Sequence, residues 1–158
     1  MKKGKFFYVI CDNIRSLENV GSIFRTADAL AIDKVFLCGI SGKPPAHKIS
    51  KTALGAEKTV LWEYCRQTWR LLERLKKQGV FIAALEQTKQ SISLGSASRR
   101  MQFPLALVIG HEVKGVSASA LRLADAIIKI PMLGKKESLN VAVAFGIAGY
   151  EINKRRLP

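Results

Sequence analysis

The stretch Phe6–Cys11, FFYVIC, is a continuous apolar run of aromatic and β-branched residues near the start of the chain. A run of this kind, without polar alternation, predicts a strand that is buried on both faces. After a polar loop, apolar residues recur at the spacing of an amphipathic helix, at Val20, Ile23, Phe24, Ala27 and Leu30. A buried strand followed by a helix is typical of a parallel α/β sheet.

The same alternation continues along the chain. Further apolar strands are predicted at Lys34–Cys38, Val80–Leu85, Leu105–Ile109 and Ala126–Ile130. Helices are predicted along the apolar face Leu61, Cys65, Trp69, Leu72 and Leu75, and over Ser117–Ala124 and Ser138–Asn153, while residues 41–58 form a loop with room for a short helix. We therefore expect one domain over residues 1–158, a parallel sheet with helices on both faces, and ligands at the carboxyl ends of its strands.

Composition narrows the class of protein. The 158 residues include 26 Lys and Arg against 12 Asp and Glu, which gives a formal charge of +14, and 48% are hydrophobic. That apolar content excludes disorder from low hydrophobicity, and no apolar run is long enough to span a membrane or form a signal peptide. The three cysteines form no CxxC pair and only two histidines accompany them, so we expect no metal site. A reduced, cytoplasmic protein is the expectation.

The positive charge favours an anionic partner, with nucleic acid first, although charge that merely maintains solubility is an alternative. Residues 43–58 form a basic loop in which Glu57 is the single acid. A second basic stripe at Arg66, Arg70, Arg74 and Lys77 shares its predicted helix with Glu63 and Glu73. Pairing at i+3 or i+4 would neutralise that stripe, so it favours a solvated, salt-bridged face over an RNA surface. The basic tail 154–156 fits either interpretation.

One segment that can carry chemistry follows the first strand, NIRSLENVGSIFRTA at residues 13–27. Asn19 is placed to cap the helix, and Gly21 permits close approach of another backbone. The helix start offers N–H groups, an amide and a guanidinium to a phosphate or ribose. An ordinary capped helix with a surface arginine is the alternative.

Two more such segments follow later strands. In VIGHEVKGVS, residues 108–117, Glu112 comes two residues after Gly110 at a strand end, as a substrate ligand or a turn residue. In residues 130–142 a proline ends the strand, Ser138 is expected to cap the last helix, and Asn140 is left free in its first turn. Alone, each of these segments also fits an ordinary loop that connects a strand to the next helix.

In this order, the three segments resemble the motifs of the SpoU (TrmH-like) class of SPOUT RNA 2′-O-ribose methyltransferases, over essentially the whole chain. The first motif is matched by Asn19, Gly21, Arg25 and Ala27, and the second by Gly110, Glu112 and Gly115. The third is matched by Ile130, Pro131, Met132, Ser138, Leu139, Asn140, Val141 and Ala144. Residues 51–57, KTALGAE, also resemble the family's segment after the second strand. No GxGxxG follows the first strand and no P-loop occurs, so neither nucleotide motif competes.

The resemblance implies a C-terminal deep trefoil knot, a homodimer packed through that knot, and S-adenosylmethionine as cofactor. The nearly all-round apolar helix 139–148 fits burial against the core or a partner. The cofactor would lie against three loops, at Leu85, Glu86, Gly110, Ile130, Met132, Ser138 and Leu139.

The implied reaction transfers a methyl group to a ribose 2′-hydroxyl of tRNA or rRNA, with tRNA preferred, and needs no metal. Arg25 occupies the family's catalytic position, with Asn19, Glu112 and Asn140 completing the pocket. Because arginine is too basic to act readily as a base, Arg25 is expected to bind the adjacent phosphate and the developing alkoxide.

Without an accessory RNA-binding domain, RNA contacts are expected from the core, at Arg15, Lys43, Lys48 and Lys51. His111 is expected to pack rather than to contact the substrate. Two alternatives stay open: an RNA-binding protein of this fold without methyltransferase activity, and a methyltransferase that acts on protein or a small molecule.

Overall fold

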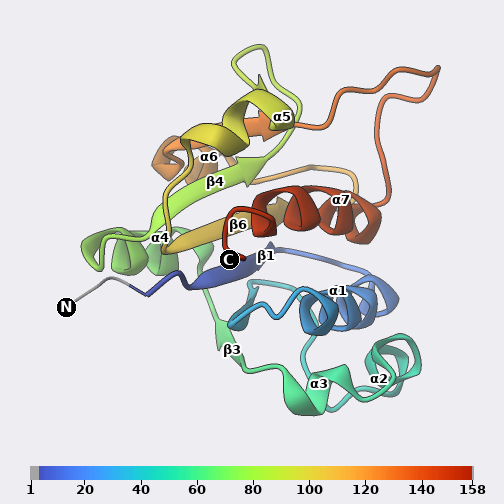
Figure 1. Cartoon of the computed structure of the whole chain (residues 1–158). Helices are drawn as coiled ribbons and strands as arrows, with labels where there is room; N and C mark the ends of the chain where they lie inside the picture. Colours follow the sequence, from blue (N-terminus) through green and yellow to red (C-terminus); the bar gives the residue numbers. More distant parts are fainter. Residues whose placement is uncertain (1–3, 158) are drawn as a thin grey trace.

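A computed structural model describes residues 4–157 and shows one seven-stranded parallel sheet in the order β3-β2-β1-β6-β4-β7-β5 (Figure 1). The strands are β1 (Phe7–Asp12), β2 (Lys34–Cys38), β3 (Trp62–Cys65), β4 (Phe81–Leu85), β5 (Ile92–Ser93), β6 (Leu105–Gly110) and β7 (Ala126–Lys129). The predicted α/β class with a parallel sheet is confirmed. The trefoil knot stays a prediction from the family resemblance.

Strand β1 lies inside the sheet, between β2 and β6, with Val9 opposite both Val35 and Leu107. Val9 belongs to the apolar cluster on one face of the sheet and Ile10 to the cluster on the other, and both are fully buried. Burial on both faces is the physical reason why the stretch FFYVIC carries no polar alternation.

Helices cover both faces of this sheet (Figure 1). The cluster on one face includes residues of α1 (Leu17–Ala29), α2 (His47–Ala53), α3 (Ala56–Thr59), α5 (Leu94–Ala97) and α7 (Val141–Asn153). The other face is covered by α4 (Thr68–Lys77) and α6 (Ala118–Leu123), and a single 3₁₀ turn, η1 (Ser98–Arg100), follows α5. Within residues 4–157, no helix has the length and apolar character that crossing a membrane requires.

Helices α1 and α7 pack side by side and run in the same direction. Asn140 lies beside Asn19 where the two helices begin, and the Asn153 side chain donates to the Leu30 carbonyl over 2.9 Å where they end. A methyl group at Gly149 would come within 2.9 Å of Leu30, so the small residue permits this close packing. Both helices therefore begin at the carboxyl edge of the sheet.

The helix predicted from Leu61 onward is wrong over its first seven residues, about two turns. Residues Trp62–Cys65 form the edge strand β3, and α4 begins only at Thr68. Leu61 is 67% exposed, so it belongs to no buried helical face, and exposure alternates along β3 as on an edge strand. Backbone pairing with β2 outweighs the coincidental helical spacing, because local pattern cannot register a neighbouring strand.

Two further differences are smaller. Residues 41–58 hold two short helices, α2 and α3, rather than a loop with one. The short strand β5, with α5 and η1 after it, had no signal in the sequence because two paired residues are too few to produce a pattern.

Candidate active site

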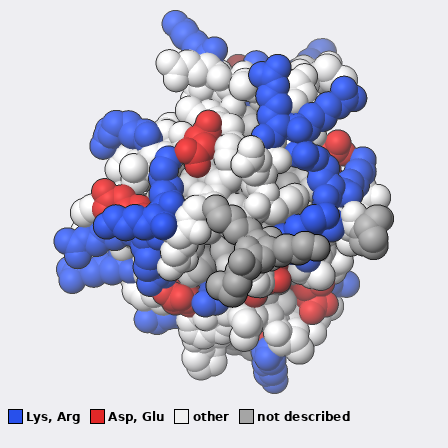
Figure 2. All heavy atoms as spheres, turned by 60° about the vertical axis from the view of Figure 1, so that its left-hand side comes forward, with Lys and Arg blue, Asp and Glu red and all other residues white. Residues whose placement is uncertain are grey.

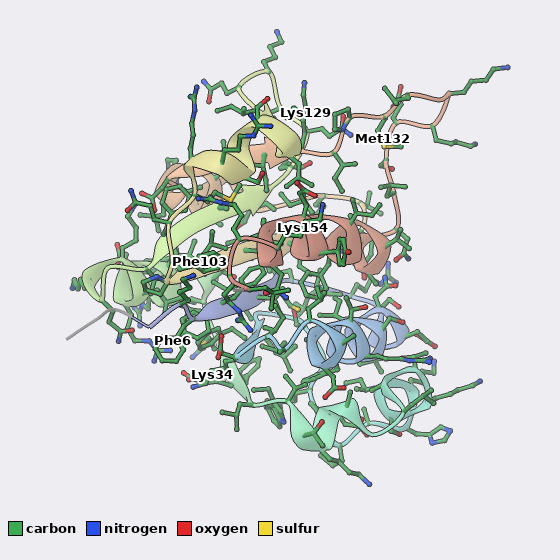
Figure 3. All side chains as sticks on the ribbon, in the orientation of Figure 1. Phe6, Lys34, Phe103, Lys129, Met132 and Lys154 are labelled. Carbon is green, nitrogen blue, oxygen red and sulfur yellow. The ribbon has the colours of Figure 1, made fainter. Side chains whose placement is uncertain are left out.

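A cavity of about 270 Å³ opens at the carboxyl edge of the sheet, where β4, β6 and β7 end and the loop before α7 passes. All seven residues expected to contact the cofactor line it: Leu85, Glu86, Gly110, Ile130, Met132, Ser138 and Leu139. Figure 3 shows two of the lining residues, Lys129 at the end of β7 and Met132 on the loop that follows. The fold thus brings the three predicted cofactor loops around one space.

Two glycines permit the loop after β6 to take its shape. A methyl group at Gly110 would collide with the backbone of Gly115 and Val116. Gly115 has a φ of +72°, and a methyl group there would collide with the Glu86 carboxylate. Only glycine avoids both the steric clash and the left-handed strain at position 115.

Glu86 holds this loop from the neighbouring strand end. Its carboxylate accepts hydrogen bonds from the backbone N–H of Val116 over 2.8 Å and of Gln87 over 2.9 Å. The side chain therefore shapes one wall of the cavity by fixing residues 115 and 116. Sequence reasoning placed Glu86 at the cavity without finding this contact.

Glu112 joins the second predicted motif to the first. Its carboxylate accepts hydrogen bonds from the backbone N–H of Arg15 over 3.0 Å and of Ser16 over 2.9 Å, and from the Asn19 side-chain amide over 3.0 Å. Partial burial by itself would raise the pKa of Glu112, but these donors together hold the pKa of this carboxyl below its ordinary value. Glu112 is therefore an ionised acceptor at neutral pH.

Asn140 adds the third motif to the same network. Its side-chain NH₂ donates to the Asn19 side-chain oxygen over 3.1 Å. Its own side-chain oxygen accepts from the backbone N–H groups of Ala142 and Val143, so Asn140 is the N-cap of α7. The three motifs thus meet as Glu112, Asn19 and Asn140, beside the cavity that Glu112 and Asn140 line.

Both expected helix caps are wrong. Ser16, not Asn19, caps α1, because its hydroxyl oxygen accepts from the Asn19 backbone N–H over 3.1 Å. Asn140, not Ser138, caps α7, so its side chain is not free. Several residues near each helix start can cap it, and only the path of the preceding loop selects among them. Gly21 does allow close approach, since a methyl group there would collide with Ile49 and Thr52 of α2.

Arg25 is the one predicted catalytic residue outside this network. It lies on the exposed side of α1 and forms no hydrogen bond or ion pair with residues 4–157. Its catalytic role stays a prediction.

The four predicted RNA contacts fall in different places. Arg15 and Lys48 line a second cavity of about 350 Å³, which shares His111, Glu112 and Val113 with the first. Lys51 is an exposed residue of α2, and Lys43 lies elsewhere, with its Nζ 4.3 Å from the centre of the Tyr64 ring. Two of the four are therefore brought to the site.

His111 has a definite structural contact. Its Nδ1 accepts hydrogen bonds from the backbone N–H groups of Val113 over 3.0 Å and Lys114 over 3.1 Å. The ring thus closes the turn that presents Glu112.

Sequence reasoning missed two residues that shape this edge. Asp12 is buried at the end of β1 and accepts from the Thr68 hydroxyl over 2.5 Å and the Ser117 backbone N–H over 2.8 Å. Lys129 lines the cavity from β7. The available signal for each was a charged residue at the end of an otherwise apolar strand.

The cavity combines apolar and polar lining residues. Among residues 4–157, no three His, Cys, Asp or Glu side chains lie close enough to hold a metal ion. Apolar walls, exposed strand-end backbone and a few convergent polar groups are typical of a site for a small organic molecule.

The chain is similar in sequence to one protein family and to named relatives. The profile of the SpoU rRNA Methylase family matches residues 6–150. Over 156 residues the chain is 33% identical to a tRNA (guanosine(18)-2′-O)-methyltransferase of Aquifex aeolicus, which covers 98% of this chain and 72% of that protein. The chain spans 60% of a matched relative from Bacillus subtilis and 59% of one from Vibrio vulnificus.

Two solved structures extend this likeness. An S-adenosylmethionine-bound rRNA methyltransferase from Sinorhizobium meliloti superposes with a TM-score of 0.90 at 26% identity, covering 99% of this chain and 59% of that one. A structure described as giving insight into the 2-OH methylation of C/U34 on tRNA has a TM-score of 0.83 at 27% identity and covers 96% of each chain.

Proposed function

The chain belongs to the SpoU rRNA methylase family, and on that premise we propose that it is an S-adenosylmethionine-dependent RNA 2′-O-ribose methyltransferase. The observation that carries this proposal is the convergence of Glu112, Asn19 and Asn140 beside a cavity lined by all seven expected cofactor contacts. The parallel sheet brings these three segments to one edge, and the motif residues of all three form a single polar network beside the cavity there.

The cavity fits the proposed cofactor. Leu85, Ile130 and Leu139 offer apolar surface, and Gly110 and Gly115 line the cavity with backbone alone. When bound there, S-adenosylmethionine would supply a methyl group from its sulfonium. The neutral thioether that remains is a good leaving group without help from a metal. The strand ends would hold it, while Glu86 keeps the loop of residues 110–116 in place.

The polar network would then position the ribose. Glu112 holds the backbone of residues 15 and 16, and Asn19 and Asn140 fix each other's orientation, so the network is rigid before substrate arrives. Arg25 would bind the adjacent phosphate and stabilise the charge that develops on the 2′-oxygen as the hydroxyl proton passes to that phosphate or to water.

We propose that the enzyme is a homodimer that packs through α7. Helix α7 exposes an apolar stripe at Val143, Ile147 and Tyr150, with Ile147 43% exposed. A methyl group at Gly146 would lie 3.8 Å from Thr26, so α1, which also carries the exposed Arg25, runs beside α7. A second copy docked there would bury the stripe and bring Arg25 to the boundary between subunits.

The dimer has a matched test. Ile147→Asp is expected to give a monomer in sedimentation velocity, because a carboxylate would be buried in the interface. Ile92→Asp is the control, since Ile92 is similarly exposed (44%) but lies on the edge strand β5 and not on α7. A dimer that survives Ile147→Asp contradicts this proposal.

For the substrate we propose tRNA ahead of rRNA, in the cytoplasm where such RNA is found. Support comes from the structure concerned with C/U34 of tRNA, whose length this chain nearly equals, although the Sinorhizobium relative is an rRNA methyltransferase.

The decisive experiment incubates the protein with methyl-labelled S-adenosylmethionine and either bulk tRNA or bulk rRNA, and then maps the modified position. We expect label on a ribose 2′-oxygen and its loss in Arg25→Ala, with cofactor binding retained. Label on a base, or on protein or a small molecule instead of RNA, would overturn the reaction. RNA binding without saturable cofactor binding in calorimetry would instead indicate an RNA-binding protein of this fold.

A further inference from the structure

Positive charge is distributed widely over the molecule. Figure 2 looks toward the side of the sheet at which β1 and β4 begin, and shows Lys and Arg side chains at several separate places on that face. Total charge therefore does not locate a binding surface. The arginines and lysines that no acid neutralises are more informative.

At the end of β3 the ion pairs differ from those expected. Glu63 lies on the strand rather than on a helix, and its carboxylate pairs with Arg74 over 2.7 Å and with Lys34 over 3.4 Å. The predicted neutralisation of the whole arginine stripe is therefore wrong. Arg66 and Arg70 are exposed and take part in no ion pair within residues 4–157.

These two arginines line a cavity of about 360 Å³, which we name the β3 cleft: Glu63, Tyr64, Cys65, Arg66, Gln67, Arg70, Leu71 and Arg74. Lys43 reaches it from the basic loop, with its Nζ 4.3 Å from the Tyr64 ring centre. The Arg70 guanidinium lies 5.1 Å from the Trp69 ring centre. Lys43 of the basic loop and the arginines 66 and 70 thus come together beside the exposed Tyr64 ring.

The β3 cleft and the candidate active site share one edge of the sheet. The strand order β3-β2-β1-β6 separates the end of β3 from the Glu112 loop by three strand spacings, about 14 Å. Direct contacts cross this interval: Tyr64 Oη donates to the Gly39 carbonyl over 2.9 Å, and the Ile40 N–H donates to the Asn13 side chain over 3.0 Å. A short length of RNA strand spans such a distance.

We propose that the β3 cleft binds the phosphate backbone of the RNA strand that enters the active site, with Arg66 and Arg70 as its phosphate ligands. The inference rests on the proposed function and extends it to a second contact surface. Guanidinium groups match phosphate oxygens in pairs, and the exposed Tyr64 ring that lines the cleft offers a stacking surface to an unpaired base, with the partly buried Trp69 ring beside Arg70. That combination of cations and aromatic rings fits single-stranded or loop RNA better than an acidic peptide.

The test compares two double variants with equal charge loss. Arg66→Gln/Arg70→Gln removes the proposed ligands, and Arg99→Gln/Arg100→Gln removes two exposed arginines of η1, which precedes the start of β6 at the opposite edge. Binding of end-labelled bulk tRNA and bulk rRNA is measured by filter retention over a series of salt concentrations. Calorimetry with S-adenosylmethionine shows whether each variant keeps an intact site.

We expect Arg66→Gln/Arg70→Gln to weaken RNA binding roughly tenfold and to lower the slope of log affinity against log salt by about 1.4, as for two lost single-strand phosphate contacts. Arg99→Gln/Arg100→Gln should change the RNA affinity and the salt slope much less. The affinity for S-adenosylmethionine should be the same in the wild type and in both double variants. Lys43→Ala should weaken RNA binding in the same direction.

If the two double variants have equal RNA affinity and equal salt slope, the proposal that the β3 cleft binds RNA is wrong. If the wild type methylates RNA while Arg66→Gln/Arg70→Gln binds it normally, the cleft alone is wrong. If RNA binding depends on these arginines but no methyl group is transferred, the proposed function alone is wrong.

Discussion

The side chain of Asn140 donates a hydrogen bond to the side chain of Asn19 over 3.1 Å, although the two residues are 121 positions apart. Asn19 in turn donates to Glu112, so one amide bridges the starts of α1 and α7 and the loop after β6. Because each residue of this chain of contacts orients the next, the network should respond to substitution as a unit.

Asn140 has two separable contacts, since its oxygen caps α7 and its NH₂ reaches Asn19. Asn140→Ala removes both and should lower the free energy of unfolding by about 1 kcal/mol, the usual value of an N-cap. Asn140→Asp keeps the cap but has no NH₂, so it should retain stability and lose methyl transfer. Urea unfolding and single-turnover assays measure the two effects. Full activity in Asn140→Asp would show that the Asn19 contact is dispensable.

Gly115 shapes the cavity through its φ of +72° and its contact with Glu86. Gly115→Ala should cost about 1–2 kcal/mol in backbone strain and push the Glu86 carboxylate aside, so cofactor affinity in calorimetry should fall by about tenfold or more. Gly134→Ala is the matched control, because a methyl group there meets no atom within 4 Å. Equal cofactor affinity in the two variants would contradict this view of the loop.

Asp12 should be a stability residue of the site's edge. Asp12→Ala leaves the Thr68 hydroxyl and the Ser117 N–H without their acceptor in a buried position, which should cost about 3 kcal/mol. Asp28→Ala is the control, since Asp28 is exposed and accepts only a 3.3 Å hydrogen bond from Thr59. Thermal unfolding compares the two variants, and similar melting temperatures would show that Asp12 does not contribute this stability.

The lowered pKa of Glu112 predicts how the stability of the protein changes with pH. Its pKa in the folded protein lies below the ordinary value of 4.5, so its contribution to stability is complete above pH 4.5 and is lost as the pH falls through the folded pKa. Unfolding measured between neutral and acidic pH should therefore show a steeper loss of stability in the wild type than in Glu112→Gln. Parallel pH profiles for the two proteins would rule out this linkage.

Much of the fold follows from sequence because its signals are local. The apolar runs of β1, β2, β4, β6 and β7 needed no partner to be recognised, since a strand buried on both faces is apolar throughout. The edge strand β3 was missed because it is half exposed and acquires its identity from pairing with β2. The same limit applied to β5, which has two paired residues.

The site divides in the same way. From its strand pattern the sequence predicted that the loops after the strand ends meet at one edge of a parallel sheet, and the family resemblance then named the residues of those loops that line the cavity. Tertiary structure alone decided what each side chain contacts. It made Asn140 the cap of α7 and gave Glu112 its backbone donors, and it left Arg25 outside the network. It also paired Glu63 with Arg74, so that Arg66 and Arg70 form no ion pair within the described residues. These contacts join residues that are distant in the chain, and hydrogen bonds of about 3 Å depend on a packing geometry that no local pattern encodes.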